Sequence, residues 1–361
     1  NTVDPSPPPP GDITPLEKPC CKECMDLGGK SVTDATVSEL KLQSSSSESK
    51  LQSSSEAGNT ETTFESQIKE FANENIVSQN LDQITEKAPE SVKQAQSTFV
   101  ETSKNTPEAI RQVTELFSSI VESDPKLLEP VAKALEQIAS NSPQLMEPAL
   151  SNLSQITNNS PHLLPTASTM LSTILKVAPD STEQVVNLMT QLTKTSESSL
   201  PQVVSSIHQI ATNQPNELNS VISTLSQVAT SSVPDAAGPA SLVLVQLSQI
   251  SQELTTQGLQ IFSHVNASSP QDLLHVTQNI KEIATNAPLE LKSVLPTLSQ
   301  IGDNSPKALV TVTRAMSLIT NDAPQVLHQV AMTSLQISKT SPEQLTQVSQ
   351  SLAQIAMNSP Q

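Results

Sequence analysis

Three cysteines near the start of the chain are the most chemically reactive residues of the sequence. Cys20, Cys21 and Cys24 lie in the segment KPCCKECMDLGG, and the chain has no other cysteine. A structural zinc site needs four ligands, and the first histidine is as far away as His162. In a secreted protein an odd cysteine count predicts one local disulfide and one thiol for disulfide-linked self-association. A small disulfide loop with a spare thiol explains the cluster equally well.

Two serine runs, each ending near a glutamate, follow the cysteines. They form a short duplication, KLQSSSSES from Lys41 and KLQSSSE from Lys50, in which Ser46 and Ser54 stand two residues before a glutamate. The runs resemble the phosphoserine clusters of secretory calcium-binding phosphoproteins such as the caseins. This resemblance implies that Ser46 and Ser54 are phosphorylated, and phosphate oxygens suit Ca²⁺ or a mineral face. The alternative is a flexible serine-rich linker.

Three Asn-x-Ser sequons lie further along the chain, at Asn152, Asn158 and Asn266. They are candidate N-glycosylation sites, although a chain this rich in Asn and Ser contains such matches by chance. Asn158 is expected to be the most accessible because it falls at an expected helix end.

The motifs that support catalysis or cofactor binding are missing from the sequence. It has no HExxH, GxSxG, Walker or GxGxxG motif and only seven glycines. The histidines are scattered, without a metal-ligand pair at helical spacing: His162, His208, His264, His275 and His328. We therefore predict a protein that is not an enzyme, with no catalytic residue and no cofactor. Ca²⁺ at the acidic, serine-rich N-terminal region is the one ion that this prediction leaves open.

Charge and hydropathy exclude two classes of partner. The net charge is −17 and arginine occurs only at Arg111 and Arg314, so the basic patch that nucleic-acid binding needs is absent. No stretch approaches the eighteen apolar residues of a membrane span. We expect neither a nucleic acid nor a membrane span.

Prolines recur every eighteen residues, which is the signature of a repeat architecture. With one inserted residue before Pro234, the series is Pro89, Pro107, Pro125, Pro143, Pro161, Pro179, Pro215, Pro234, Pro270, Pro288, Pro306, Pro324, Pro342 and Pro360. Glu197 and Gln252 occupy the two skipped places. Counting each proline as position 1, apolar residues fall at positions 4, 7, 11 and 14, as in Leu128, Val131 and Leu135. This spacing predicts one apolar stripe on an α-helix.

The ends of each repeat carry residue types that commonly end one helix and cap the next. Position 18 is often a residue that can cap the next helix, and position 17 is often Asn, which tolerates the left-handed conformation past a helix end. The expected caps are Thr106, Asp124, Ser142, Ser160, Ser305 and Ser341. Position 13 is often glutamine, either hydrogen-bonded between adjacent helices as a ladder or, as we favour, facing solvent. Each repeat is thus expected to be a helix of about fourteen residues and a short turn.

Short turns make consecutive helices antiparallel neighbours, so the fold class is all-α. We predict an α-solenoid of about sixteen 18-residue helical units, stacked as antiparallel hairpins, over residues 71–361. A β-solenoid is rejected because glycine is scarce, and one long helix because each internal proline costs about 3 kcal/mol. Residues 1–70 are predicted to be a disordered, Pro/Ser-rich acidic region. The array is expected to be truncated at its C-terminus, since Pro360 opens a new repeat.

The repeats are similar to one another along the whole array. This similarity favours a protein that functions through its length and its regular surface and not through a single site. We predict a secreted, extracellular structural matrix protein, of the kind found in the organic matrix of a shell or skeleton, with other matrix proteins or a mineral surface as partners. The start at Asn1 instead of Met fits either removal of a signal peptide or a fragment of a longer chain. The alternative is a helical-solenoid scaffold that binds proteins, including a bacterial surface or host-directed repeat protein.

Overall fold

The computed structural model describes residues 74–358, which form sixteen α-helices and, within that range, no strand. The predicted all-α repeat array is confirmed. Most repeats consist of a three-residue 3-10 turn followed by a 14-residue α-helix, as in Pro125–Leu127 and Leu128–Asn141. The cysteines, the serine runs and the boundary predicted at residue 70 lie outside the described range.

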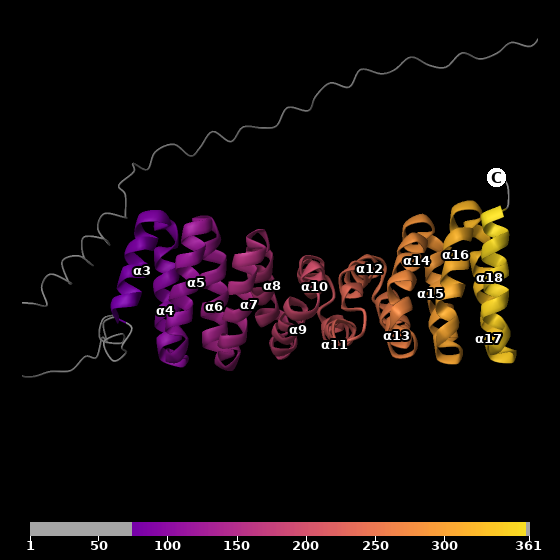
Figure 1. Cartoon of the computed structure of the whole chain (residues 1–361), viewed down its shortest axis with the longest axis horizontal. Coiled ribbons are helices and arrows are strands. Elements are labelled where there is room, and N and C mark those ends of the chain that lie inside the picture. Colours follow the sequence, from indigo (N-terminus) through magenta and orange to yellow (C-terminus); the bar gives the residue numbers. More distant parts are fainter. Residues whose placement is uncertain (1–73, 359–361) are drawn as a thin grey trace, which may run out of the picture. The chain divides into compact units, whose positions relative to one another are not determined.

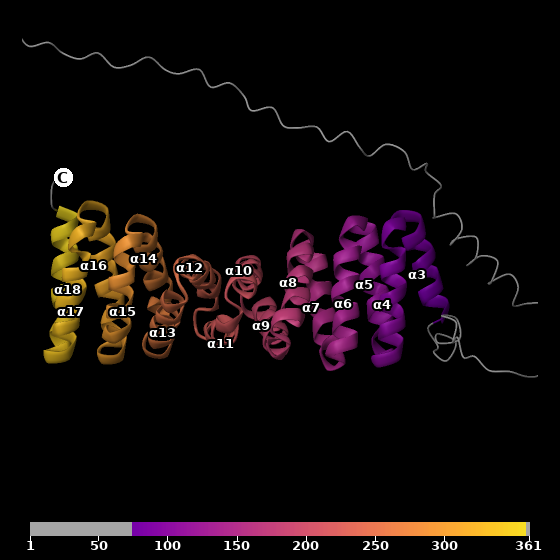
Figure 2. The same ribbon diagram turned by 180° about the vertical axis from the view of Figure 1, so that it is seen from behind.

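The helices form two layers, because each packs mainly against its second neighbour along the chain. The odd layer consists of α3 Glu74–Lys87, α5 Ile110–Ser123, α7 Met146–Asn159, α9 Thr182–Thr195, α11 Leu218–Ala229, α13 Gln252–Ser268, α15 Pro288–Asn304 and α17 Leu327–Thr340. The even layer consists of α4 Val92–Asn105, α6 Leu128–Asn141, α8 Leu164–Val177, α10 Leu200–Asn213, α12 Ala237–Ile250, α14 Leu273–Asn286, α16 Leu309–Asp322 and α18 Pro342–Asn358. Figures 1 and 2 show the helices following one another in chain order within the array.

The apolar stripe predicted from the sequence is the core between the two layers. In α6, Leu128, Val131, Leu135 and Ile138 are fully buried, and equivalent residues join them in one continuous cluster through the array. The core is almost entirely aliphatic, with an edge-to-face pair of Phe rings in α4 and α5 as its main aromatic contact. Burial of aliphatic side chains between stacked repeats is therefore the chief stabilising term.

Short 3-10 turns connect most of the helices, and proline opens nearly all of them. The turns are η1 Pro89–Ser91, η2 Pro107–Ala109, η3 Pro125–Leu127, η4 Pro143–Leu145, η5 Pro161–Leu163, η6 Pro179–Ser181, η7 Glu197–Ser199, η8 Pro215–Glu217, η9 Pro234–Ala236, η10 Pro270–Asp272, η11 Pro306–Ala308 and η12 Pro324–Val326. In α15 and α18 the proline is instead the first residue of a 17-residue α-helix. Proline suits these positions because it has no N–H to leave unpaired.

The predicted capping by position 18 is wrong for most of the repeats. Thr106, Ser142, Ser160 and Ser305 make no side-chain cap, whereas Asp124 accepts a hydrogen bond from the Lys126 amide at 3.2 Å. Backbone hydrogen bonds replace the side-chain cap. The Ser142 N–H donates to Ile138 O at 2.8 Å, and the Ser142 C=O accepts from the Leu145 N–H at 2.9 Å. Because one residue both ends a helix and begins the next turn, a side-chain cap is not required.

The predicted left-handed conformation at position 17 is also wrong. Asn141, Asn159 and Asn286 are the last α-helical residues of α6, α7 and α14. The residue that leaves the helix is the next one, and in Ser142 it has φ −148° and ψ 59°, which an ordinary L-residue can adopt. The 3-10 turn begins at once, so no glycine-like residue is needed.

Candidate functional site

Buried polar side chains connect helices of the same layer. Asn152 in α7 is 2% exposed, and its Nδ2 donates to Val186 O and to Thr190 Oγ1 in α9, both at 3.1 Å. In the even layer, Thr98 Oγ1 donates to Ala132 O at 2.9 Å. The linked residues stand 34 to 42 positions apart, which is about two repeats. These bonds fix the register of the second-neighbour packing, because a shift by one residue would leave buried polar atoms unpaired.

The three sequons occupy different environments in the array. Asn158 is exposed near the end of α7, Asn266 is half-buried in α13, and Asn152 is buried with its amide nitrogen already bonded. The expectation that Asn158 is the most accessible is therefore met, and folded Asn152 offers no free amide to a glycan. Cys20, Cys21, Cys24, Ser46 and Ser54 lie outside the described residues, so their modification stays a prediction.

The histidines are not brought together. His264 Nε2 in α13 lies 3.1 Å from Asp303 Oδ1 in α15, which joins two neighbouring helices of the odd layer. Among residues 74–358, no group of three or more His, Cys, Asp or Glu side chains could hold a metal ion. The His264–Asp303 contact is thus an inter-repeat contact, and among the described residues no third His, Cys, Asp or Glu joins it as a metal ligand.

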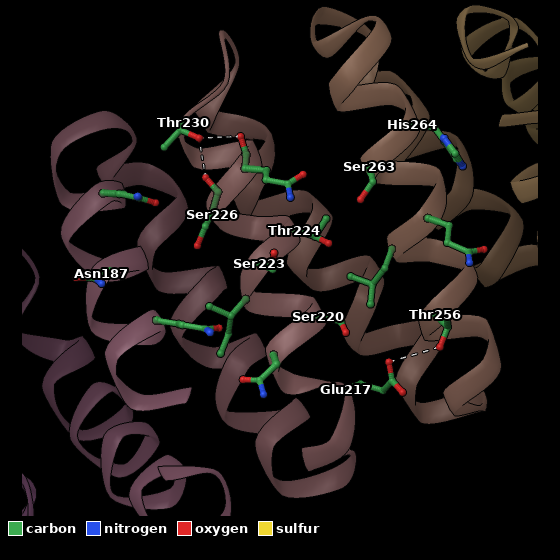
Figure 3. A pocket seen from close by; sticks show the side chains of 17 residues that line it. Asn187, Glu217, Ser220, Ser223, Thr224, Ser226, Thr230, Thr256, Ser263 and His264 are labelled. Atoms are coloured by element: carbon green, nitrogen blue, oxygen red, sulfur yellow. Dashed lines mark hydrogen bonds between the residues drawn. The ribbon is translucent and has the colours of Figure 1, made fainter. Parts of the chain in front are cut away.

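An open hollow runs across three helices of the odd layer, α9, α11 and α13. We call it the odd-layer groove; its volume is about 980 Å³. Its walls carry hydroxyl and amide side chains, of which Asn187, Ser220, Ser223, Ser226 and Ser263 are labelled in Figure 3. Ile222 and Leu259 are buried apolar residues of its floor. Helices contact one another more extensively in the even layer along most of the array, which leaves room for grooves between the odd helices.

The odd-layer groove is lined mainly by uncharged polar side chains. No Lys or Arg lines it, and its one carboxylate, Glu217, accepts hydrogen bonds from Gln252 Nε2 at 2.6 Å and Thr256 Oγ1 at 3.5 Å. His264 of α13 also lines the groove, and its Nε2 lies 3.1 Å from Asp303 Oδ1 of α15. The groove therefore carries two titratable side chains, Glu217 and His264, among hydroxyl and amide groups.

One polar atom of the groove lining is buried without a partner in the protein. The Oε1 atom of Gln191 accepts no hydrogen bond within the described residues and is shielded from solvent. The Oε1 atom of Gln137, at the same repeat position of α6 in the even layer, is also buried and unpaired, so this feature is not confined to the groove.

A second, smaller groove of about 430 Å³ lies between α5 and α7, also in the odd layer. It is lined by Gln112, Ser119, Ser151, Ser154 and Asn158, together with two glutamates. Both grooves therefore present the same kinds of side chain at related positions of the repeat.

Comparison with protein-family models, curated proteins and solved structures found no match to this chain.

The sequence missed the groove, although its signal is present. Position 12 of successive odd-layer repeats is a small hydroxyl residue in Ser118, Ser154, Thr190, Ser226, Ser263 and Ser299. Position 13 is glutamine in Gln83, Gln155, Gln191, Gln227, Gln300 and Gln336. The row at position 12 emerges only when every second repeat is aligned, which needs the layer assignment that the structure supplies. Glutamine at position 13 is common to both layers, as Gln137, Gln209 and Gln354 of the even layer show. The glutamines are mostly exposed or half-buried, as favoured from the sequence, and no Gln–Gln ladder joins them among the described hydrogen bonds.

Proposed function

We propose that this chain is a non-enzymatic structural repeat protein of a secreted extracellular matrix. The observation that carries the proposal is the unbroken second-neighbour packing from α3 to α18, with one kind of polar surface repeated along it. Such an array acts through its length and its regular faces, because each repeat contributes a similar surface. No helix in the part of the chain described is long and apolar enough to cross a membrane.

The N-terminal sequence supports the same function from another direction. Cys20, Cys21 and Cys24 supply thiols for crosslinking, and phosphorylated Ser46 and Ser54 would add negative charge for Ca²⁺ or a mineral face. In this proposal the N-terminal region attaches the chain to other matrix proteins or to mineral, and the array extends the attachment. An organic-matrix component of a shell or skeleton is the specific form that fits both features.

Mass spectrometry of the native protein tests this proposal. We expect oxidised cysteines and phosphate on the serine runs. Fully reduced thiols together with unmodified serines would contradict secretion to a calcium-rich matrix.

The odd-layer groove favours a second candidate, a scaffold that binds another protein. Helical solenoids commonly bind partners along one face. However, hot spots of protein interfaces are enriched in Trp, Tyr and Arg, and the chain has no Trp, no Tyr and no arginine in this groove. Recovery of one stoichiometric protein partner from the native source would favour this candidate over the first.

A further inference from the structure

We propose that the even layer binds a second copy of this chain and forms a non-covalent dimer. The contact uses what we call the dimer face, the outward side of α8, α10, α12 and α14. These four helices follow one another in the even layer, and each packs against the next (Figure 1). The dimer needs neither the cysteines nor the serine runs, so it is independent of the proposed matrix function.

Helix α12, at the centre of the dimer face, has an apolar composition on every side. Its sequence is AGPASLVLVQLSQI, in which serine and glutamine are the polar residues. Leu244 and Leu247 are fully buried in the core, whereas Leu242 is 38% exposed on the outward side. A helix that is apolar all round is normally buried all round. The described array has two layers, so none of its helices lies over the outward side of α12, which is open to a partner.

The apolar residues of the dimer face replace charged residues found elsewhere in the even layer. Leu242 stands at position 9 of its repeat, and Leu274 of α14, which is 41% exposed, stands at position 5. At the same positions the other even helices carry exposed charged residues: Lys93 of α4 and Glu129 of α6 at position 5, and Lys133 of α6 and Arg314 of α16 at position 9. The dimer face therefore differs from the rest of this layer.

The centre of the dimer face is uncharged. Among the helices of residues 74–358, α10, α11 and α12 are the ones that contain no Asp, Glu, Lys or Arg. Charged residues lie around this centre, in α8 and α14 and in the turns before α10, α12 and α14: Lys176, Lys281, Glu282, Glu197, Asp235 and Asp272. An uncharged centre inside a charged rim is the usual arrangement of a protein–protein interface.

The charge of the whole chain favours a second copy as the occupant. At a net charge of −17, two copies repel each other over most of their surfaces. This repulsion is weakest where the uncharged centres of two dimer faces meet. A strongly basic partner would find its carboxylates at the rim and elsewhere on the chain, and not in α10 or α12. A two-fold dimer uses the same patch on both copies, which suits a patch that carries no charge of either sign.

The dimer face is large enough for a stable interface. Each of its four helices has 14 residues, which gives a length of about 21 Å. Helices that pack side by side lie about 9 Å apart, so the four present about 750 Å². A stable protein interface buries about 800 Å² on each partner. Two copies that meet through this face therefore bury enough surface for a specific dimer.

The test is sedimentation equilibrium of the full chain over a range of concentrations. A reductant excludes disulfide-linked association, and a pH of about 8 keeps His208 and His275 of the dimer face neutral. Leu242→Glu places a charge at the centre of the face. Its control is Met332→Glu in the odd-layer helix α17, at the same repeat position, where the methionine is 48% exposed.

A second pair of variants keeps the test independent of any one substitution. Leu274→Glu adds a charge to the face from α14, and Leu289→Glu in the odd-layer helix α15 is its control, because that leucine is 86% exposed. Circular dichroism of each variant shows whether the array stays folded. If one face variant unfolds, the other still decides the result.

We expect a monomer–dimer equilibrium in the unchanged chain and in both controls. Each face variant should weaken dimerisation tenfold or more, because two like charges are brought to an uncharged interface. Added NaCl should strengthen the dimer, since screening lowers the repulsion between two acidic chains.

Three results would overturn the inference. A chain that stays monomeric up to about 100 µM, well above the dissociation constants of specific complexes, would leave the face to another protein or to another segment of the chain. A dimer that both face variants leave unchanged would place the contact elsewhere. An equal loss in the odd-layer controls would show a general effect of added charge. None of these results bears on the proposed matrix function, which depends on the state of the native cysteines and serines.

Discussion

At the residue scale, buried polar side chains decide the register of the repeats. Asn152 and Thr98 each bond to a backbone carbonyl of the helix two places further along the chain. An aliphatic core alone tolerates small slips between repeats, because Leu, Ile and Val pack in several ways. The buried Asn152 amide does not tolerate a slip, because it would lose both Val186 O and Thr190 Oγ1. The Thr98 hydroxyl is less strict, since it also donates to Gln94 O of its own helix at 2.8 Å.

Replacing Asn152 by Ala should destabilise the array by about 1 to 3 kcal/mol, because two buried hydrogen bonds are lost. The measurement is urea unfolding followed by circular dichroism. Gln155→Ala is the matched control, since Gln155 is exposed on the same helix, and its effect should stay within about 0.5 kcal/mol. Equal effects of the two substitutions would contradict the role given to Asn152.

Substitution of a core residue and substitution of a turn residue should have clearly different effects on the folding of the array. Leu135 is fully buried in α6, so Leu135→Asp places a charge in the aliphatic core and should unfold its repeat and both neighbours. Pro143 opens the next turn at a half-buried position, and Pro143→Ala should cost little. Limited proteolysis should find new cleavage sites around α6 in the first variant only. Cleavage at the turn in the second variant would reverse this assignment of core and turn.

At the element scale, most of the fold could be predicted from the sequence and the details of the turns could not. The eighteen-residue proline spacing and the stripe of Leu128, Val131, Leu135 and Ile138 predict the helices and their buried face correctly. Ser142 and Asn141 look like a cap and a helix terminator, yet backbone bonds through Ser142 perform both tasks. Side-chain preferences cannot show this, because a continuous 3-10 turn satisfies the free amides in another way.

Helix capping gives a direct check of this correction. Ser251 accepts a hydrogen bond from the Leu254 amide at 3.2 Å, whereas Ser142 makes no side-chain cap. Ser251→Ala should therefore destabilise the array by about 1 kcal/mol, and Ser142→Ala should have almost no effect. Thermal and urea unfolding of both variants measure the difference. A larger loss in Ser142→Ala would restore the capping role that the sequence predicts.

At the scale of the whole molecule, negatively charged side chains outnumber positively charged ones, and few of them form ion pairs. The net charge is −17 with His neutral, and the described residues contain one Arg–Glu ion pair, Arg111 with Glu115, besides the contact of His264 with Asp303. Both are at least partly exposed, so they contribute little to stability. Repulsion between carboxylates is then the main long-range electrostatic effect.

Added salt should accordingly stabilise the array. Raising NaCl from about 10 mM to about 300 mM shortens the screening length well below the spacing of most charges. The urea midpoint should rise, because screening weakens the repulsion between carboxylates more than it weakens the exposed Arg111–Glu115 ion pair. A midpoint that falls with salt would mean that attractive pairs dominate.

The candidate site shows where sequence reasoning ends. The rows of Ser and Gln are present in the sequence, but their meeting on one face depends on which helices are second neighbours. The burial of the unpaired Gln191 Oε1 atom likewise cannot be read from the residue type. A surface formed by several repeats is therefore a property of the array and not of a motif.

The proposed matrix function is tested most directly by the distribution of the native protein across a sequential extraction of its source, quantified from peptides of the array. We expect the protein to stay in the insoluble extracellular fraction and to be released only when disulfides are reduced and Ca²⁺ is chelated. Recovery from the soluble intracellular fraction, in a stoichiometric complex with one other protein, would contradict it.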